Sequence, residues 1–244
     1  MVFYSAIRRP NSGYIYEHNH FVLPDNYMLN FDVWCTDIQP KIKEGMEKYK
    51  WEDKEEVVFW RGKLTGMHLD KFPVGVAEHN PSPEKVKEMI LEDPRLWQRV
   101  YLCFLSALHP EIIDSKINDE FPLHSQLMAF KEHGWHKHEG FKKAALETYK
   151  LITQKFKDAV LREDMVSNQT MTTMGKVSIT DHLKYKYLIS VDGNTCAWQR
   201  VPWIMLSGSV LLLVETDMEE WFYADIIPYF HYVPIKNDLS DLVQ

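Results

Sequence analysis

Polar and charged residues gather at the ends of apolar runs between residues 184 and 242, and their types suit a phosphate and a sugar. A guanidinium group and the free amide groups at a helix N-terminus both favour an anion such as a diphosphate. A carboxylate at a strand end can accept hydrogen bonds from ribose or sugar hydroxyls. The residues at these junctions are Asp192, Gly193, Asn194, Arg200, Ser207, Gly208, Ser209, Glu215 and Glu220. This pattern favours a nucleotide diphosphate attached to a sugar, and it fits equally well an ordinary α/β half-domain whose junctions are solvated.

The first junctions follow a predicted strand and a predicted helix. The run Tyr185–Val191 is apolar and aromatic and stops at Asp-Gly-Asn, which predicts a buried parallel strand that ends in a tight turn. A helix is predicted over Trp198–Leu206, with Pro202 in its first turn. Arg200 then lies beside the helix N-terminus. Ser207-Gly208-Ser209 closes this helix, because glycine is favoured just past a helix end.

The next junctions extend the same alternation. Val210–Val214 is an uninterrupted apolar strand with Glu215 at its carboxyl end. Asp217–Ala224 predicts a short capped helix, His231–Ile235 a third strand, and Asn237 the cap of one more helix. Strands that alternate with helices predict parallel βαβ units, and ligands of such sheets lie outside the carboxyl ends of the strands.

A second candidate loop lies upstream, in the segment VVFWRGKLTG at residues 57–66. It is typical of a strand that enters a glycine-containing loop, where Gly62 and Gly66 let the backbone approach a phosphate. Arg61 and Thr65 could supply hydrogen-bond donors. The segment lacks the G-x-x-x-x-G-K-[ST] pattern of a Walker loop, so by itself it has little specificity.

Both blocks resemble glycosyltransferase family 90. The resemblance lies in the ordered runs KYKYLISVDGNTCAWQR, SGSVLLLVE, EWFY and HYVPIKNDLSDL, and upstream in FWRGKLTG, which is similar to the family's W-R-G-x-x-T block. The family includes protein O-glucosyltransferases of the Rumi type and fungal capsule-associated xylosyltransferases. The resemblance implies an α/β fold of the GT-B kind, with two Rossmann-like halves facing a cleft.

The resemblance also implies a division of the chain and a shortened N-terminal half. Residues 1–165 would form a partial, acceptor-side Rossmann-like region with helical insertions, and residues 174–244 the donor-nucleotide-binding βαβ region. A polar, turn-like linker is expected over residues 167–173. The family's pattern extends beyond both ends of the chain, so the N-terminal half is expected to be incomplete.

The implied reaction transfers glucose or xylose from a UDP-sugar to a hydroxyl of a protein or glycan acceptor, with inversion and without a metal. The UDP-sugar is a co-substrate, and no cofactor is expected. Arg61, Thr65, Arg200 and the amides near 207–209 would hold the diphosphate, with Asp192, Gly193 and Asn194 close by. Glu215 or Glu220 would bind hydroxyls. The family's acidic base block is absent. Asp25, Asp32 and Asp37 are the nearest replacements, and Asp25 is the candidate base.

Other interpretations use the same residues differently. A truncated, non-catalytic module could bind a nucleotide, or it could bind carbohydrate through aromatic residues such as Trp198, Trp221 and Phe222. Those aromatics also suit an ordinary core. A histidine cluster in the segment HGWHKHE, residues 133–139, could suggest a metal, but the spacing differs from H-E-x-x-H and Gly134 breaks a helix there. No metal site is expected.

Composition limits the remaining partners. The formal charge of −7 argues against a general nucleic-acid surface, and three widely spaced cysteines indicate neither a disulfide scaffold nor a zinc site. No apolar run approaches the roughly 20 residues of a membrane span, and the first residues lack a signal-peptide pattern. The resemblance implies the lumen of the endoplasmic reticulum or Golgi if a longer N-terminus exists.

Overall fold

The computed structural model describes residues 30–63, 65–68, 81–118, 177–193, 195–197 and 199–244, together with 2–4, 6–8, 20–22, 24 and 172–173. The chain forms two compact units, Met1–Trp60 with Lys176–Gln244 (unit 1) and Arg61–Gly175 (unit 2). Residues 1–60 thus group with the C-terminal part of the chain. The predicted division into 1–165 and 174–244 stays a prediction.

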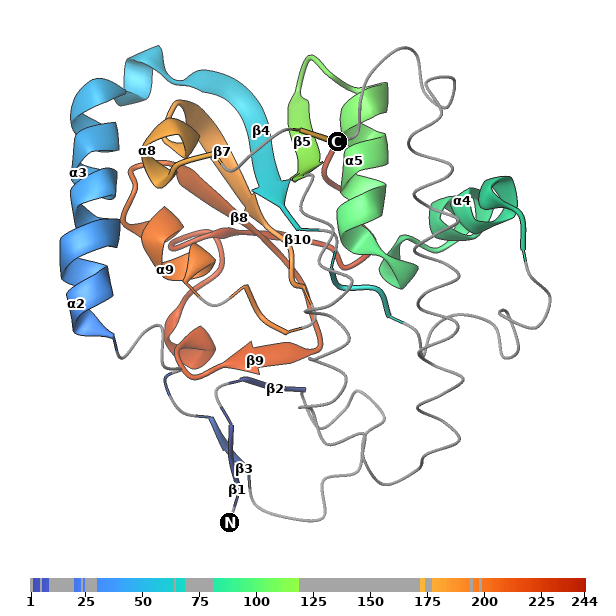
Figure 1. Ribbon diagram of the computed structural model, residues 1–244, viewed down its shortest axis with the longest axis horizontal. Coiled ribbons are helices and arrows are strands. Elements are labelled where there is room, and N and C mark those ends of the chain that lie inside the picture. The colour runs from blue at the N-terminus through green and yellow to red at the C-terminus, as the bar shows by residue number, and fades with distance from the viewer. Residues whose placement is uncertain are drawn as a thin grey trace. The chain divides into compact units, whose positions relative to one another are not determined.

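Unit 1 is built on four parallel strands in the order β10-β8-β7-β4 (Figure 1). They are β4 (Glu55–Gly62, whose last two residues belong to unit 2), β7 (Tyr185–Ser190), β8 (Val210–Val214) and β10 (Val233–Ile235). Buried parallel strands read as continuous apolar runs, because both of their faces are covered. The predicted strands at 185–191 and 210–214 are confirmed, and the third begins two residues later than predicted.

Three helices of unit 1 pack on one face of these strands: α3 (Gln39–Lys48), α8 (Ile179–His182) and α9 (Arg200–Met205) (Figure 1). The short helix α2 (Phe31–Val33) and a π-helical stretch, Trp34–Ile38, lead into α3. Their core joins Ile38, Ile42, Phe59, Leu183, Leu188, Val201, Trp203, Ile204, Leu211, Leu213 and Phe222. The helix predicted at 198–206 is therefore confirmed as α9, and its N-terminus follows the end of β7.

The segment predicted as a helix over Asp217–Ala224 is instead a strand and a turn, so that prediction is wrong. Strand β9 (Met218–Glu220) pairs antiparallel with β2 (Ala6–Arg8), and a 3-10 turn follows at Tyr223–Asp225. A helix of eight residues is marginal without tertiary support, whereas strand pairing satisfies the same backbone groups. A further parallel pair joins β1 (Val2–Tyr4) and β3 (His20–Val22).

The helix predicted after Asn237 is also wrong, because residues 237–244 form turns. Leu239 has a φ of 59°, a left-handed conformation that a helix cannot contain. The Asn237 side chain donates to the Glu215 carbonyl oxygen (3.0 Å) rather than capping a helix. The C-terminal turns are therefore attached to the carboxyl end of β8.

Unit 2 contains α4 (Pro83–Glu92), a 3-10 turn at Pro94–Leu96, α5 (Gln98–Leu108), β5 (Ile113–Asn118) and β6 (Thr172–Thr173). Strands β5 and β6 are parallel. Helix α5 is fastened to β5 by Ser106, whose Oγ donates to the Ile113 carbonyl oxygen and accepts from the Ser115 amide, both at 2.9 Å. In the described part of the chain, no helix is long and apolar enough to cross a bilayer.

Candidate functional site

The carboxyl ends of β7, β8 and β10 bring several predicted residues to one edge of the unit 1 sheet. Asp192 and Gly193 follow β7, Glu215 follows β8, and Asn237 follows β10. Because neighbouring parallel strands end at the same edge, these residues come from separate parts of the sequence to one place. We call this the carboxyl edge, and the opposite one the amino edge.

The turn after β7 leads into α9 through a series of hydrogen bonds. The Asp192 Oδ1 accepts from the Ala197 amide (3.0 Å), and the Gly193 amide donates to the Thr195 carbonyl oxygen (3.0 Å). The Arg200 amide then donates to the Ala197 carbonyl oxygen (2.8 Å). Asp192 is therefore a buried cap for the turn, and the turn fixes where Arg200 begins its helix.

Arg200 is the first residue of α9, and it is partly buried. Burial lowers the pKa of Arg200 to about 10, because the charged form loses hydration. That pKa still leaves the guanidinium charged at neutral pH. A partly dehydrated guanidinium binds a phosphate more strongly than a fully hydrated one, since less water must be displaced.

A polar cluster that includes Glu220 lies beside the β7 turn. Glu220, in β9, is 2% exposed, and Cys196 is also buried. Burial raises the pKa of the Cys196 thiol, the nearby carboxylates of Asp192 and Glu220 raise it further, and a hydrogen bond with Tyr223 opposes them. The thiol is therefore protonated at neutral pH and is not a nucleophile. Cys196 and Tyr223 were not predicted as site residues, because their meeting depends on the placement of β9.

A cavity of about 640 Å³ opens at the carboxyl ends of β8 and β10, and we call it the β8–β10 cavity. Its lining contains the exposed carboxylate of Glu215 and the half-buried Asp217. The other residues that line it are Leu213, Val214, Thr216, Tyr223, Ile226, Pro228, Tyr229, Tyr232, Pro234 and Asn237. The predicted hydroxyl acceptor Glu215 thus faces a space large enough for a small ligand.

The predicted residues Ser207, Gly208 and Ser209 lie at the amino edge, because α9 runs back from the end of β7 to the start of β8. Ser209 Oγ donates to the Tyr185 carbonyl oxygen (2.8 Å) and accepts from Lys54 Nζ (2.7 Å). Gly208 has a φ of 66°, the left-handed conformation predicted for a helix end. The structure does not bring these three residues together with Asp192, Arg200 and Glu215.

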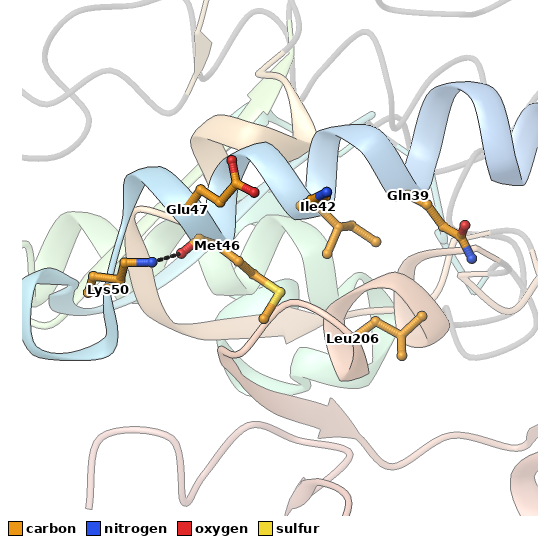
Figure 2. Close-up of a pocket in the computed structure, with 7 residues that line it drawn as sticks. Gln39, Ile42, Met46, Glu47, Lys50 and Leu206 are labelled. Atoms are coloured by element: carbon orange, nitrogen blue, oxygen red, sulfur yellow. Dashed lines mark hydrogen bonds between the residues drawn. The ribbon is translucent and has the colours of Figure 1, made fainter.

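A second, smaller cavity also lies at the amino edge. It measures about 400 Å³, and Figure 2 shows it between α3 and the C-terminal end of α9. Ile42, Met46 and Leu206 give it an apolar floor, and Lys50 donates to the Met46 carbonyl oxygen at its rim (3.2 Å). None of the predicted site residues lines this cavity.

In unit 2, the predicted residues take part in the hydrogen bonds of the fold. Arg61 is 9% exposed, and its Nη2 contacts both carboxylate oxygens of Asp114 at 2.8 Å while Nη1 donates to the Asp114 carbonyl oxygen (2.8 Å). Thr65 Oγ1 accepts from Arg99, and the Thr65 carbonyl oxygen accepts from Trp97 Nε1 (3.1 Å). Gly62 is buried at the end of β4. Asp114 and Arg99 were missed, since nothing local in sequence links them to this loop.

Several predicted residues lie outside the part of the chain that the structure describes. These are Asp25, Asn194, Trp198 and the histidines of residues 133–138. Among the residues that are described, no group of three or more His, Cys, Asp or Glu side chains could hold a metal ion. The expected base, and the expectation that no metal takes part, stay predictions.

Comparison with known proteins adds to this geometry. The family model "Glycosyl transferase family 90" matches residues 135–244. Protein O-glucosyltransferase 3 of Rattus norvegicus is 47% identical over 64 residues, which are 26% of this chain and 12% of that protein. Protein O-glucosyltransferase 2 of Danio rerio is 41% identical over 68 residues (28% and 13%), and protein O-glucosyltransferase 1 of Rattus norvegicus 34% over 93 residues (36% and 24%).

The matched stretches cover between 12% and 24% of the length of these three relatives. The family match contains β7, α9, β8, β9 and β10, and with them Asp192, Arg200, Glu215 and the β8–β10 cavity. The resemblance seen in the sequence is confirmed. The family match takes in residues 135–244, which are less than half of this chain.

Proposed function

We propose that the chain is a glycosyltransferase that binds a UDP-sugar at the carboxyl edge of unit 1 and transfers glucose or xylose to a hydroxyl of a protein or glycan acceptor. Transfer proceeds with inversion and without a metal. The family match and the O-glucosyltransferase relatives support the transferase class. If the chain is made with a longer N-terminus, the lumen of the endoplasmic reticulum or Golgi is the place of action that we propose.

The partly buried Arg200 at the start of α9, next to the turn that follows β7, is the observation that carries this proposal. The Asp192 turn holds the start of α9 through the bonds Asp192–Ala197 and Ala197–Arg200, so the backbone that carries Arg200 is set before a ligand arrives. Burial reduces the hydration of Arg200 without removing its charge at neutral pH. These properties suit a diphosphate, whose negative charge grows as the bond to the sugar breaks.

The chemistry of the transfer assigns separate tasks to the two sides of the reacting carbon. The acceptor oxygen loses its proton to a carboxylate and attacks the anomeric carbon, while the bond from that carbon to the diphosphate oxygen breaks. Arg200 stabilises the leaving diphosphate in place of a metal ion. Glu215 or Glu220 accepts hydrogen bonds from sugar or ribose hydroxyls. For the base we keep Asp25 as the candidate.

The first test is Arg200→Ala, measured by calorimetric titration with UDP. Removing a charged hydrogen-bond partner of a phosphate costs roughly 2–5 kcal/mol, so we expect UDP affinity to fall by about 30-fold or more. Arg200→Lys keeps the positive charge but loses the two-pronged guanidinium, so its UDP affinity should lie between those of the wild type and Arg200→Ala. Arg95→Ala, which removes an exposed arginine of unit 2, is the control and should bind UDP normally. Unchanged affinity in Arg200→Ala, with its thermal unfolding intact, would contradict the site.

A second measurement separates the transferase from a module that binds UDP without transfer. UDP release from UDP-glucose and UDP-xylose is followed with and without a hydroxyl-bearing protein acceptor, in the presence of EDTA. A transferase releases UDP in step with glycosylation of the acceptor, and a metal-independent one does so with EDTA present. UDP binding without any release would leave only the nucleotide-binding module.

A further inference from the structure

The β8–β10 cavity combines acidic groups with aromatic walls. Glu215 and Asp217 line it, and among the described lining residues there is no lysine or arginine. Two carboxylates without a compensating cation repel a phosphate, which needs a positive partner in a partly enclosed space. The same carboxylates are good acceptors for hydroxyl groups. The charge of the cavity therefore favours a neutral, hydroxyl-rich ligand over the diphosphate assigned to Arg200.

One aromatic wall is held in a strained turn. Tyr229 has a φ of 62°, a region that bulky residues rarely adopt, yet its side chain is 81% exposed. Its amide donates to the Tyr232 carbonyl oxygen (2.6 Å), and the His231 amide donates to the Ile227 carbonyl oxygen (2.9 Å). The Ile227 amide donates in turn to His231 Nδ1 (2.8 Å). Strain that its surroundings maintain in this way is typical of functional sites.

Core packing does not account for this strain, because the side chain that it positions is mostly in solvent. A rigid, exposed tyrosine loses little conformational entropy when a ligand binds to it, since few of its torsions remain to be ordered. The C–H face of a pyranose ring is apolar and weakly positive, and it packs on the negative face of an aromatic ring. Hydroxyls at the rim of the same ring would then meet the carboxylates of Glu215 and Asp217.

We infer that the β8–β10 cavity is a saccharide-binding subsite that takes a neutral pyranose ring, with Tyr229 as its platform and Glu215 and Asp217 as its hydroxyl acceptors. The inference deepens the sugar side of the proposed function and does not require Arg200 to bind a diphosphate. The ring can belong to a glycan or to the sugar of the donor, since both present the same chemistry.

The test uses the full chain with methyl glucoside and methyl xyloside as probes, followed by saturation-transfer NMR and by calorimetry. Tyr229→Gly should weaken saccharide binding at least tenfold and at the same time raise the unfolding temperature, because glycine accepts the positive φ without strain. A tyrosine with a purely structural role would instead lower that temperature when removed. Tyr229→Phe keeps the ring and should bind nearly as the wild type does.

Two further variants complete the experiment. Phe230→Ala is the matched control, because Phe230 is next to Tyr229 and 79% exposed but does not line the cavity, so its saccharide binding should be unchanged. Glu215→Gln should weaken binding by about tenfold through the loss of a charged acceptor. Saccharide binding that survives in Tyr229→Gly, or that is absent from the wild-type chain, overturns the inference.

UDP titrations identify the source of the ligand and keep the two proposals apart. The subsite predicts that Tyr229→Gly binds UDP as the wild type does, and an equal loss of UDP affinity would overturn it by placing the nucleotide in the cavity. If UDP-glucose competes with methyl glucoside and UDP alone does not, the result supports the subsite and identifies its ligand as the sugar of the donor. Saccharide binding in a chain that does not bind UDP supports the subsite and contradicts the proposed function.

Discussion

The two edges of the unit 1 sheet carry similar residues but use them differently. At the amino edge, Lys54 is 5% exposed and donates to Ser209 Oγ, which itself donates to the backbone of β7. At the carboxyl edge, Arg200 begins its helix beside a turn set by Asp192, and Glu215 faces a cavity of about 640 Å³. The serines of the amino edge serve the fold, whereas at the carboxyl edge a predicted site residue, Glu215, lines a cavity.

This difference shows that a polar residue between a strand and a helix is not yet a site residue. In a parallel sheet every second junction lies at the amino edge, away from the place where ligands collect. Ser207 and Ser209 have side chains that could bind a phosphate, but they lie at a junction of that second kind. Changes at the carboxyl edge should therefore alter ligand binding, and changes at the amino edge should alter stability.

Among the variants that compare the two edges through the hydrogen bonds of the fold, Asp192→Ala should have the largest effect. The variant removes the charged acceptor of the partly buried Ala197 amide, which should cost about 2 kcal/mol in the free energy of unfolding and loosen the start of α9. UDP affinity should also fall, by roughly tenfold. Calorimetry and chemical denaturation measure the two effects. Asp192→Asn retains an acceptor at Oδ1 and should recover most of the affinity, so an equal loss in both variants would contradict the role of the turn.

Lys54→Met should change the pH dependence of stability without changing the affinity for UDP. Burial lowers the pKa of Lys54 from 10.5 to about 8 in the folded chain. Between these two pH values, Lys54 is protonated in the unfolded chain and deprotonated in the folded chain. Its contribution to the free energy of unfolding of the wild type therefore increases as pH rises. Allowing for partial hydration, the gain is roughly 1.5 kcal/mol.

The methionine variant lacks this contribution. It should therefore be the more stable protein at pH 7 and lose that advantage by pH 10.5, as measured by urea denaturation at several pH values. Every other titrating group is shared by the two proteins and cancels in the difference. A difference that does not vary with pH would mean that Lys54 is hydrated, and a loss of UDP affinity would contradict the division between the edges.

Ser209→Ala should have the smallest effect. The variant removes the hydroxyl between Lys54 Nζ (2.7 Å) and the Tyr185 carbonyl oxygen (2.8 Å), which should cost about 1 kcal/mol in the free energy of unfolding. UDP affinity should stay within twofold of the wild type. If UDP binding weakens tenfold while stability holds, the amino edge takes part in the site, and the comparison between the edges fails.

The sequence predicted the parts of unit 1 that depend on local pattern. Apolar runs predicted β7 and β8, and Pro202 and Gly208 predicted the bounds of α9. These signals work because buried parallel strands and helix ends impose their own residue preferences within a few positions. The sequence runs around these elements were specific enough to indicate the family. Arg200 at the carboxyl edge follows from these local elements.

The features that the sequence did not predict depend on distant partners. Strand β9 forms against β2, which lies more than 200 residues earlier, and this pairing overrides the helical pattern of its segment. Arg61 is occupied by Asp114 through a contact that spans 53 positions. Whether a junction lies at the carboxyl or the amino edge depends on where α9 starts and on the direction in which it runs. None of these relationships is encoded in neighbouring residues.

The pairing of β2 with β9 also protects the chain from association with itself. The register Ala6–Glu220 to Arg8–Met218 occupies the backbone donors and acceptors along one side of β9. A chain shortened by its first eight residues would expose that side as an unpaired strand edge, which is a template for another chain. Proteolysis in this early segment would therefore first appear as concentration-dependent aggregation, before the helices on the sheet unfold.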